Sequence, residues 1–198
     1  MPALITHLRR DAARNRSKVL EAAREALAER QALSFNDLAR RAEVGVGTVY
    51  RHFPSVEVLR EHLVAESLDE LVAVGREATQ NSEPGVGLAR FLASVTQVQM
   101  RDEALEQVIE AATDHDPHTT AVKAELNQIF LGLIRAAAGS GALQPGVTPR
   151  ELIAMVCGVA HSARLLPADE VEAGARRFMS IMIAGLGLPP GDEDELPG

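Results

Sequence analysis

The chain has few residues that can form covalent cross-links or stack on a ligand. Its 198 residues include one cysteine, Cys157, which excludes an intramolecular disulfide bond and gives no sign of an oxidising compartment. Tryptophan is missing, and the other aromatic residues are Tyr50 and five phenylalanines, which disfavours a site for a large stacked planar ligand. Lysine occurs twice against 18 arginines, and with the abundant alanine this indicates GC-rich coding and a bacterial source.

Hydrophobic runs long enough to cross a membrane are also missing. The most apolar stretch, Phe178 to Leu188, contains Ser180 and ends at Pro189, well short of the roughly 20 residues that span a bilayer. The N-terminal residues reach arginines at once, without the apolar segment of a secretory signal peptide. The sequence therefore predicts a cytoplasmic protein without a membrane partner.

Recognisable catalytic motifs are missing as well, including a Gly-rich phosphate loop, a nucleophile elbow and an HExxH helix. Residues 114–118 alternate imidazoles and carboxylates, but Asp116 followed by Pro117 is interpreted as a helix start, and two ligands alone make a poor zinc site. Cys157 lies in an apolar stripe and is interpreted as core. We therefore predict no catalytic residue, no metal and no cofactor.

The residues from Leu33 to Pro54 follow the order that a helix-turn-helix DNA reader requires. A first helix can start at Ser34, whose hydroxyl can cap it, with Asp37 as the capping acid three positions on. Its apolar stripe consists of Phe35, Leu38, Ala39 and Ala42.

A second helix can start after Gly45 and stop at Pro54. Its inward side carries Val49 and Phe53, four positions apart. Its outward side carries Gly47, Thr48, Arg51 and His52. An exposed helix of this length with polar and cationic groups fits a DNA major groove, so it is interpreted as a recognition helix.

The segment from about Arg14 to Leu63 resembles the DNA-binding domain of the TetR family of transcriptional repressors, above all in the run GTVYRHFP from Gly47 to Pro54. The resemblance implies an all-α fold, with an N-terminal three-helix helix-turn-helix domain followed by a larger helical ligand-binding and dimerisation domain. It also implies a homodimer that binds a palindromic double-stranded DNA operator and responds to a small-molecule effector of unknown identity.

The resemblance also implies where DNA is contacted. Residues placed like Thr48, Tyr50 and His52 contact phosphates or base edges, whereas the positions of Val46 and Gly47 approach bases. The positions of Ser34 and Asn36 touch DNA from the preceding helix. With one exposed arginine and two arginines of the N-terminal arm, the predicted DNA-binding residues are Arg14, Arg16, Ser34, Asn36, Val46, Gly47, Thr48, Tyr50, Arg51 and His52.

Three residues depart from the family pattern. Glu43 stands where a turn glycine is usual, which predicts a strained or altered turn and a carboxylate near DNA. Gly45 replaces the usual capping serine. Val56 replaces a lysine that pairs with a phosphate, so affinity is expected to depend more on the N-terminal arm.

Charge is segregated along the chain. The net charge is −8, but residues 1–65 carry eleven basic and eight acidic groups. The excess of acidic residues therefore lies in residues 66–198. Within the first 18 residues, five basic groups oppose only Asp11. This pattern suits an arm that lies along phosphates or reaches a minor groove, although a solvated tail would have the same composition.

Three segments are expected. Residues 1–65 form the helix-turn-helix domain, with the basic arm at 1–18 and the helix-turn-helix at about 33–52. Residues 66–188 form the helical effector-binding and dimerisation domain, and residues 189–198 an acidic disordered tail. One helix is predicted to run from Ser55 to about Thr79 and to act as a lever between the domains.

The last two helices, at about 150–165 and 168–186, carry apolar stripes that could close the monomer's core. The family resemblance favours a four-helix dimer interface instead, formed by Ile153, Val156, Ala160, Ala175, Phe178 and Met182. A small effector is expected in an apolar cavity of the same domain. Its predicted contacts are Phe91, Met100, Gln107, Asn127, Phe130, His161 and Arg164.

The sequence thus predicts a DNA-binding transcriptional regulator, a dimeric repressor that a small-molecule effector releases from its operator, with activation left open. The alternative is an all-helical small-ligand carrier or enzyme without DNA binding. Thr48, Tyr50 and His52 favour the regulator, because an enzyme has no reason to place them on a short protruding helix beside a basic arm.

Overall fold

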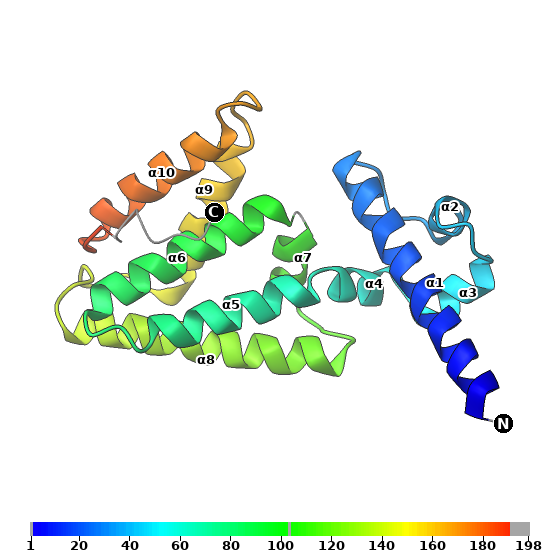
Figure 1. Cartoon of the computed structure of the whole chain (residues 1–198). Coiled ribbons are helices and arrows are strands. Elements are labelled where there is room, and N and C mark those ends of the chain that lie inside the picture. Colours follow the sequence, from blue (N-terminus) through cyan, green and yellow to red (C-terminus); the bar gives the residue numbers. More distant parts are fainter. Residues whose placement is uncertain (1, 103, 191–198) are drawn as a thin grey trace.

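The computed structural model describes residues 2–102 and 104–190, with side chains described from Arg10 onward (Figure 1). The described residues form helices and no strand, which confirms the predicted all-α fold. None of these helices is long and apolar enough to cross a membrane. In chain order they are α1 (Pro2–Ala28), α2 (Phe35–Arg41), α3 (Val46–His52), α4 (Val56–Leu63), α5 (Ala65–Ala78), α6 (Pro84–Arg101), α7 (Ala104–Glu110), α8 (Pro117–Gly139), α9 (Pro149–Ala163) and α10 (Val171–Gly185).

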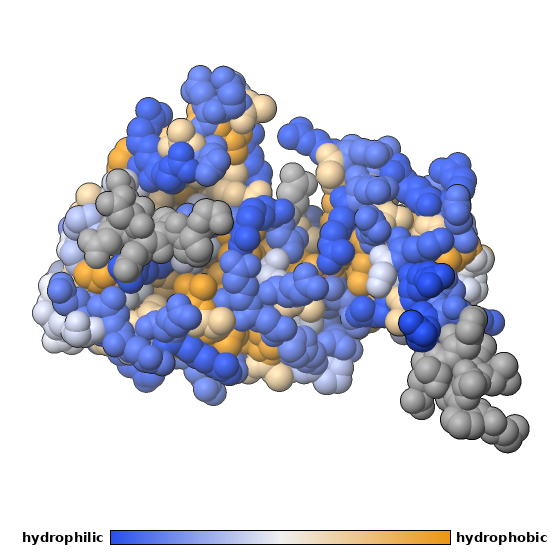
Figure 2. Space-filling view, in the orientation of Figure 1, coloured by the Kyte–Doolittle hydropathy of each residue, from blue (hydrophilic) through white to orange (hydrophobic). Residues whose placement is uncertain are grey.

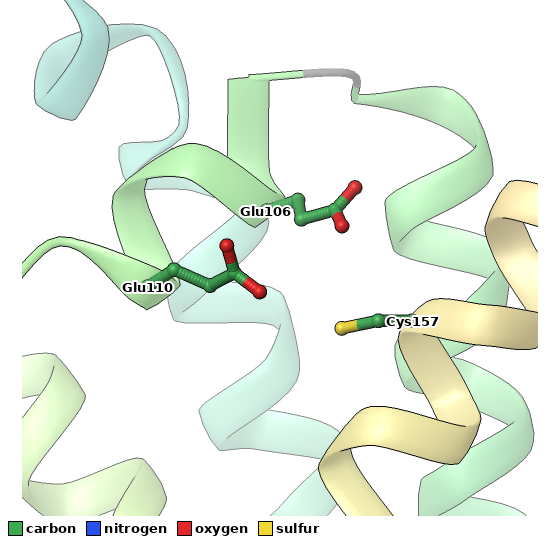
Figure 3. Close-up of side chains that lie close together, drawn as sticks. All are labelled: Glu106, Glu110 and Cys157. Atoms are coloured by element: carbon green, nitrogen blue, oxygen red, sulfur yellow. The ribbon is translucent and has the colours of Figure 1, made fainter.

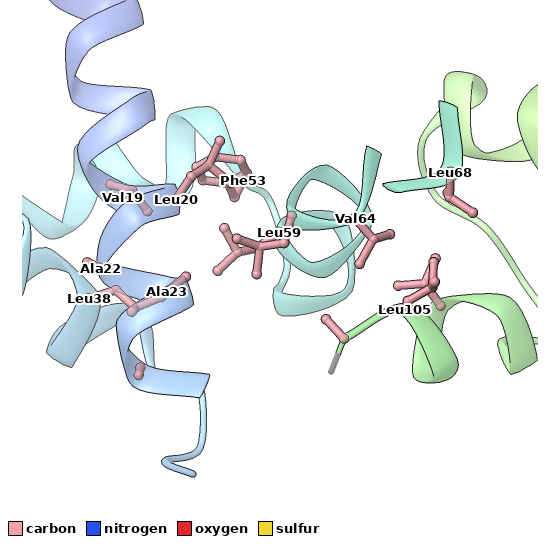
Figure 4. Packing of buried hydrophobic residues seen from close by; sticks show 14 of the residues in the cluster. Val19, Leu20, Ala22, Ala23, Leu38, Phe53, Leu59, Val64, Leu68 and Leu105 are labelled. Carbon is pink, nitrogen blue, oxygen red and sulfur yellow. The ribbon is translucent and has the colours of Figure 1, made fainter. Parts of the chain in front are cut away.

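The molecule has two parts, which we call the reader (α1 to α4) and the larger domain (α5 to α10) (Figure 1). One cluster of buried apolar residues runs from the reader into the larger domain (Figure 4). It includes Val19 and Phe53 at the reader end and Leu68 and Leu105 at the other. A second cluster fills the larger domain between α6, α8, α9 and α10. The boundary predicted at residue 65 therefore does not divide the buried core.

The lever predicted from Ser55 to Thr79 is two helices rather than one. The Ser55 Oγ accepts a hydrogen bond from the Val58 N–H at 3.3 Å and caps α4, as the sequence predicts. However, α4 ends at Leu63, and Val64, with φ −96° and ψ 1°, joins it to α5. Val64 is fully buried in the same cluster as Leu105 of α7 (Figure 4). The apolar spacing continues through this bend, so the sequence pattern does not reveal it.

The N-terminal arm is part of α1, which begins at Pro2 (Figure 1). A helix with its side chains is about 10 to 12 Å across, whereas the minor groove of B-DNA is about 6 Å wide. Of the two contacts that the sequence left open for the arm, the helical form therefore fits phosphate contact and not insertion into the minor groove.

Close backbone packing fixes α5 against its neighbours in the larger domain. A Cβ atom on Gly75 would lie 2.7 Å from the Ile129 Cγ2 of α8, and one on Gly87 of α6 would lie 2.5 Å from the Ala78 carbonyl oxygen. These distances are too short for any side chain larger than hydrogen. The two glycines thus set how closely α6 and α8 approach α5.

Side-chain caps start two helices of the larger domain. The Asp116 carboxylate accepts hydrogen bonds from the N–H groups of His118 (3.0 Å) and Thr119 (3.2 Å), with Pro117 in the first turn. This confirms the interpretation of residues 114–118 as a helix start. A capping box of Thr148 with Glu151 starts α9 and lowers the pKa of Glu151, because its carboxylate accepts hydrogen bonds from Thr148.

Candidate DNA-binding site

The turn between α2 and α3 has the hydrogen bonds of a Schellman C-cap. The Val44 N–H donates to the Ala39 carbonyl at 2.9 Å, and the Glu43 N–H donates to the Arg40 carbonyl at 3.3 Å. Glu43 has a φ of 54°, in the left-handed region that favours glycine and costs other residues free energy. The strain expected where a turn glycine is usual is therefore confirmed.

We expect Glu43→Gly to raise the free energy of unfolding by about 1 kcal/mol, because glycine adopts the left-handed conformation without a Cβ clash. Because Glu43 is exposed beside α3, the same change should also strengthen DNA binding by removing a carboxylate. Glu43→Gln removes only the charge and should strengthen DNA binding without stabilising the fold. Urea denaturation and fluorescence anisotropy measure the two effects. Equal stability of the two variants would contradict the assigned strain.

Helix α3 has one buried side and one exposed side. Val49 and the following Phe53 are fully buried beneath it. On the other side, Val46 is 41% exposed and Tyr50 57% exposed. Gly47 and Arg51 are exposed too, whereas Thr48 and His52 are half-buried. The arrangement confirms the inward and outward sides that the sequence indicates and leaves the outward side open to a groove of DNA.

The exposed side of α3 is held in place from behind. The Tyr50 ring meets the Phe35 ring edge to face, with centroids 4.9 Å apart, so the tyrosine is fixed although it is exposed. A Cβ on Gly47 would meet nothing within 4 Å, which leaves room for a base or backbone to approach. Arg51 forms no ion pair with any other described residue, so its charge is available to a phosphate.

Helix α2 places Ser34 and Asn36 beside α3, but its predicted capping box does not form. Ser34 has extended N-cap backbone angles, yet its side chain makes no capping hydrogen bond. Asp37 instead accepts a hydrogen bond from Arg40 at 2.8 Å, which removes it from the helix start. Asn36 is exposed. The Ser34 hydroxyl therefore remains available for contact with another molecule.

An arginine ties the end of α2 to the end of α1. The Arg41 guanidinium donates to both Glu29 carboxylate oxygens, at 3.2 and 2.6 Å, and to the Gln31 Oε1 at 2.8 Å. The hydrogen bonds from Arg41 lower the pKa of Glu29. This contact joins the end of α2 to the turn after α1, and sequence inspection did not identify it.

The two predicted arm arginines lie in different settings. Arg14 is exposed on α1, whereas Arg16 is half-buried, with its guanidinium carbon 5.7 Å from the centroid of the Phe53 ring at the end of α3. Both are therefore carried by the reader, and Arg16 lies directly beside the recognition helix.

Two family models match the sequence. One, described as bacterial regulatory proteins of the tetR family, matches residues 19–63. The other, described as the C-terminal domain of SbtR-like transcriptional regulators, matches residues 83–188. The chain belongs to the TetR family of transcriptional regulators. A search among curated proteins found no match.

Solved structures of transcriptional regulators, among them TetR-family members, have the same fold. A regulator from Streptomyces coelicolor is 23% identical, with a TM-score of 0.54, over 88% of this chain and 99% of that one. PfmR from Thermus thermophilus is 21% identical, with a TM-score of 0.63, over 85% and 98%. FadR from Bacillus subtilis, solved in complex with stearoyl-CoA, is 16% identical, with a TM-score of 0.57, over 85% and 98%.

The predicted effector residues of this TetR-family regulator are not gathered around one cavity. Phe91 and Phe130 are buried in the core between α6 and α8, with ring centroids 6.1 Å apart. Met100 is half-buried, and Asn127 and His161 are exposed. Exposure of the last two differs from the expected enclosed cavity, because the faces of α8 and α9 that carry them point away from the core.

Gln107 and Arg164 are the two predicted effector residues that the fold brings together. They line a groove of about 490 Å³ between the reader and the larger domain. Figure 2 shows the molecule hollowed between the end of α1 and helices α9 and α10. The lining residues are Leu27, Arg30, Gln31, Ala32, Leu33, Arg60, Gln107 and Arg164.

The six predicted dimer residues divide into two sets. Val156, Ala160 and Ala175 are buried within the chain itself and expose little surface to a partner, so their place in a dimer interface stays a prediction. Their stripe closes the monomer's own core, the alternative that the sequence pattern left open. Phe178 and Met182 instead line a shallow groove of about 390 Å³ on the outer side of α9 and α10. Ile153 is 43% exposed.

Sequence inspection missed two charged residues, of which Glu61 joins the reader to the larger domain and Lys123 joins α7 and the loop after it to α8. Glu61 of α4 is 4% exposed, and its carboxylate accepts hydrogen bonds from the His115 N–H (2.8 Å) and the Asp116 N–H (2.6 Å). Lys123 of α8 donates to two carbonyl oxygens at the end of α7 and to the Asp114 carboxylate at 2.7 Å. In the sequence, the one sign of the Glu61 contact was a glutamate within an amphipathic helix, since such a residue needs a partner when it is buried.

Proposed function

We propose that this TetR-family regulator is a homodimeric repressor that leaves a palindromic operator when a small anionic molecule binds between its reader and its larger domain. The observation that carries DNA binding is α3, a short helix with Tyr50 and Arg51 exposed above the buried Val49 and Phe53. We place this regulator in the bacterial cytoplasm. Its proposed role as a repressor requires no catalytic activity.

The outer groove of α9 and α10 supports the dimer. Its lining is Met155, Gly158, Val159, Ser162, Phe178 and Met182, which is apolar apart from one serine. Nearby, Leu165 in the turn after α9 is 74% exposed, and Ile181 of α10 is 64% exposed. Exposed apolar side chains that gather on one face are typical of a protein interface. A second copy packed in this groove would complete the four-helix interface and set two recognition helices apart for two half-sites.

The groove between the reader and the larger domain supports the anionic effector. Its three arginines come from the end of α1 (Arg30), from α4 (Arg60) and from the end of α9 (Arg164). Neither Arg30 nor Arg60 forms a salt bridge with another described residue, although Arg60 attracts Glu57 on the same helix. Guanidinium groups bind carboxylates and phosphates through paired hydrogen bonds, while Leu27 and Leu33 offer apolar contact.

A ligand in this groove would contact both parts of the molecule, so it can fix the angle between them. Suppose that the ligand binds better to the form in which the two readers are wrongly spaced. Bound operator must then weaken ligand binding by the same factor by which bound ligand weakens operator binding. The ligand would be an anionic metabolite selected by screening, and calorimetry would measure its affinity with and without saturating operator. We expect the two affinities to differ by a factor of about 5 to 150. Equal affinities in the two titrations would show that the ligand is not the inducer.

DNA binding itself is tested by substitutions on the exposed side of the helix-turn-helix. Tyr50→Phe keeps the contact with Phe35 and removes one hydroxyl, and His52→Ala removes one ring. Each should weaken binding to every duplex by about 1 kcal/mol, roughly fivefold, because both residues are assigned to the DNA backbone. Asn36→Ala should in addition relax the preference at one base pair.

Fluorescence anisotropy on operator fragments, selected from genomic DNA, measures these affinities across a salt series. Gln80→Ala, an exposed change in the turn after α5, is the matched control and should bind as the unaltered protein does. Unchanged affinity of both the Tyr50 and the His52 variants would contradict the proposed docking of α3.

A further inference from the structure

Three side chains with metal-binding atoms meet where α7 faces α9, next to Arg164, which also lines the groove proposed for the effector. Glu106 and Glu110 project from α7 toward Cys157 on α9 (Figure 3). One carboxylate oxygen of each glutamate and the Cys157 Sγ all lie within 4.8 Å of one another. The two glutamates are four positions apart, so they share one face of α7.

A buried amide without a full set of hydrogen bonds lies at the same place. The Gln99 side chain is 3% exposed, and its Nε2 lies 3.6 Å from the Cys157 Sγ. Its Oε1 is buried and has no hydrogen-bond partner among the residues that the structure describes. An unpaired buried amide oxygen is costly, and rotating the amide by half a turn would place this oxygen beside the sulfur instead. Gln99 thus offers an oxygen to an ion held by Cys157.

We propose that Cys157, Glu106 and Glu110, together with the Gln99 side-chain oxygen, bind one Zn²⁺ ion per chain. Zinc is bound by thiolate sulfur at about 2.3 Å and by carboxylate oxygen at about 2.0 to 2.2 Å, in tetrahedral geometry. Donors around such an ion are about 3.5 Å apart. Side chains now within 4.8 Å reach that spacing through small rotations of the two flexible glutamates.

The thiolate decides the class of metal. Mg²⁺ and Ca²⁺ take oxygen ligands and do not favour sulfur, whereas Zn²⁺ accepts sulfur and oxygen together. A thiolate and two carboxylates carry three negative charges. Arg164 lies beside them, with its Nη1 3.8 Å from the Glu106 Oε2 and its Nη2 donating to the Gln99 carbonyl at 2.5 Å. One Zn²⁺ and the Arg164 guanidinium together balance the charge of the site.

The site would join α7 to α9. Leu105 and Val108 of α7 belong to the buried cluster that contains Val64, the residue between α4 and α5. A bound ion would therefore hold α9 against the helix that packs on the link to the reader. The ion site shares Arg164 with the proposed effector groove, but its ligands are other residues and its tests need neither DNA nor an effector.

Cobalt titration of the full chain tests the site. Co²⁺ replaces Zn²⁺ in such sites, and a thiolate ligand gives it a strong charge-transfer absorption in the near ultraviolet. We expect this absorption to appear with one Co²⁺ per chain and to disappear when Zn²⁺ is added. Zn²⁺ should also slow the alkylation of Cys157, a readout that needs no DNA.

Variants assign the ligands. Cys157→Ser should abolish the absorption, and Glu106→Gln and Glu110→Gln should each weaken Co²⁺ binding at least about tenfold. Glu77→Gln, an exposed change on α5, is the matched control and should bind as the unaltered chain does. Circular dichroism establishes that each variant is folded. Lack of the absorption in the unaltered chain, or its persistence in folded Cys157→Ser, would overturn the proposal.

Discussion

Met182→Glu is expected to yield a folded monomer whose affinity for an operator with two half-sites is lower by about 10²- to 10⁴-fold. Met182 lines the outer groove of α9 and α10 and is only half-buried, so a glutamate there reaches water in the isolated chain. In the proposed dimer the same carboxylate would be unpaired within a helix interface, which costs several kcal/mol. Loss of the dimer removes the second half-site and its effective concentration.

Light scattering and anisotropy on a palindromic fragment measure the two effects. Ala173→Glu is the matched control, because Ala173 is exposed and lies nine positions earlier, on the opposite side of α10. Ala160, by contrast, is 1% exposed inside the chain, so a charge there would destabilise the fold and would not test the interface. A Met182→Glu protein that stays dimeric at the usual affinity would place the interface elsewhere.

Glu61→Ala is expected to lower the free energy of unfolding by about 3 kcal/mol. Its carboxylate is buried and accepts two hydrogen bonds from backbone N–H groups of residues 115 and 116, and a hydrogen bond to a charged group contributes about 1.5 to 3 kcal/mol. Glu61→Gln keeps one acceptor oxygen in the same shape and should cost less.

Urea denaturation measures these losses. Glu66→Ala, an exposed change in the first turn of α5, is the control and should alter stability by less than about 0.5 kcal/mol. Because Glu61 ties α4 to the loop before α8, its loss should also weaken the coupling between effector and operator. A Glu61→Ala protein as stable as the control would contradict the anchoring role of this carboxylate.

The helix-turn-helix could be predicted from sequence because its determinants are local. Val49 and Phe53 mark the inward side of α3, and both are fully buried. The strained turn at Glu43 could be predicted because this residue stands where the family pattern has a turn glycine, and its φ lies in the left-handed region. The bend at Val64 could not be predicted, since it depends on the packing of α7, whose Leu105 lies far along the chain.

The buried stripe of α9 shows a second limit of sequence patterns. Apolar residues such as Val156 and Ala160 recur at helical spacing, which shows that one side of the helix is covered but not by what. In this fold the cover comes from the chain itself, and the dimer interface that we propose lies instead on the outer side of α9 and α10. Glu106 and Cys157 likewise meet only through the tertiary structure.

The buried cluster that runs from α1 into α8 has a consequence for how the protein unfolds. Because residues on both sides of position 65 cover one another, the reader cannot open while the helices beneath it stay closed. Leu59, Leu63 and Val64 would be left uncovered in a fragment cut at that position. The amide hydrogens of α1 and α5 should therefore exchange with solvent in one cooperative opening, so that reader and larger domain are separate in role but form a single folding unit.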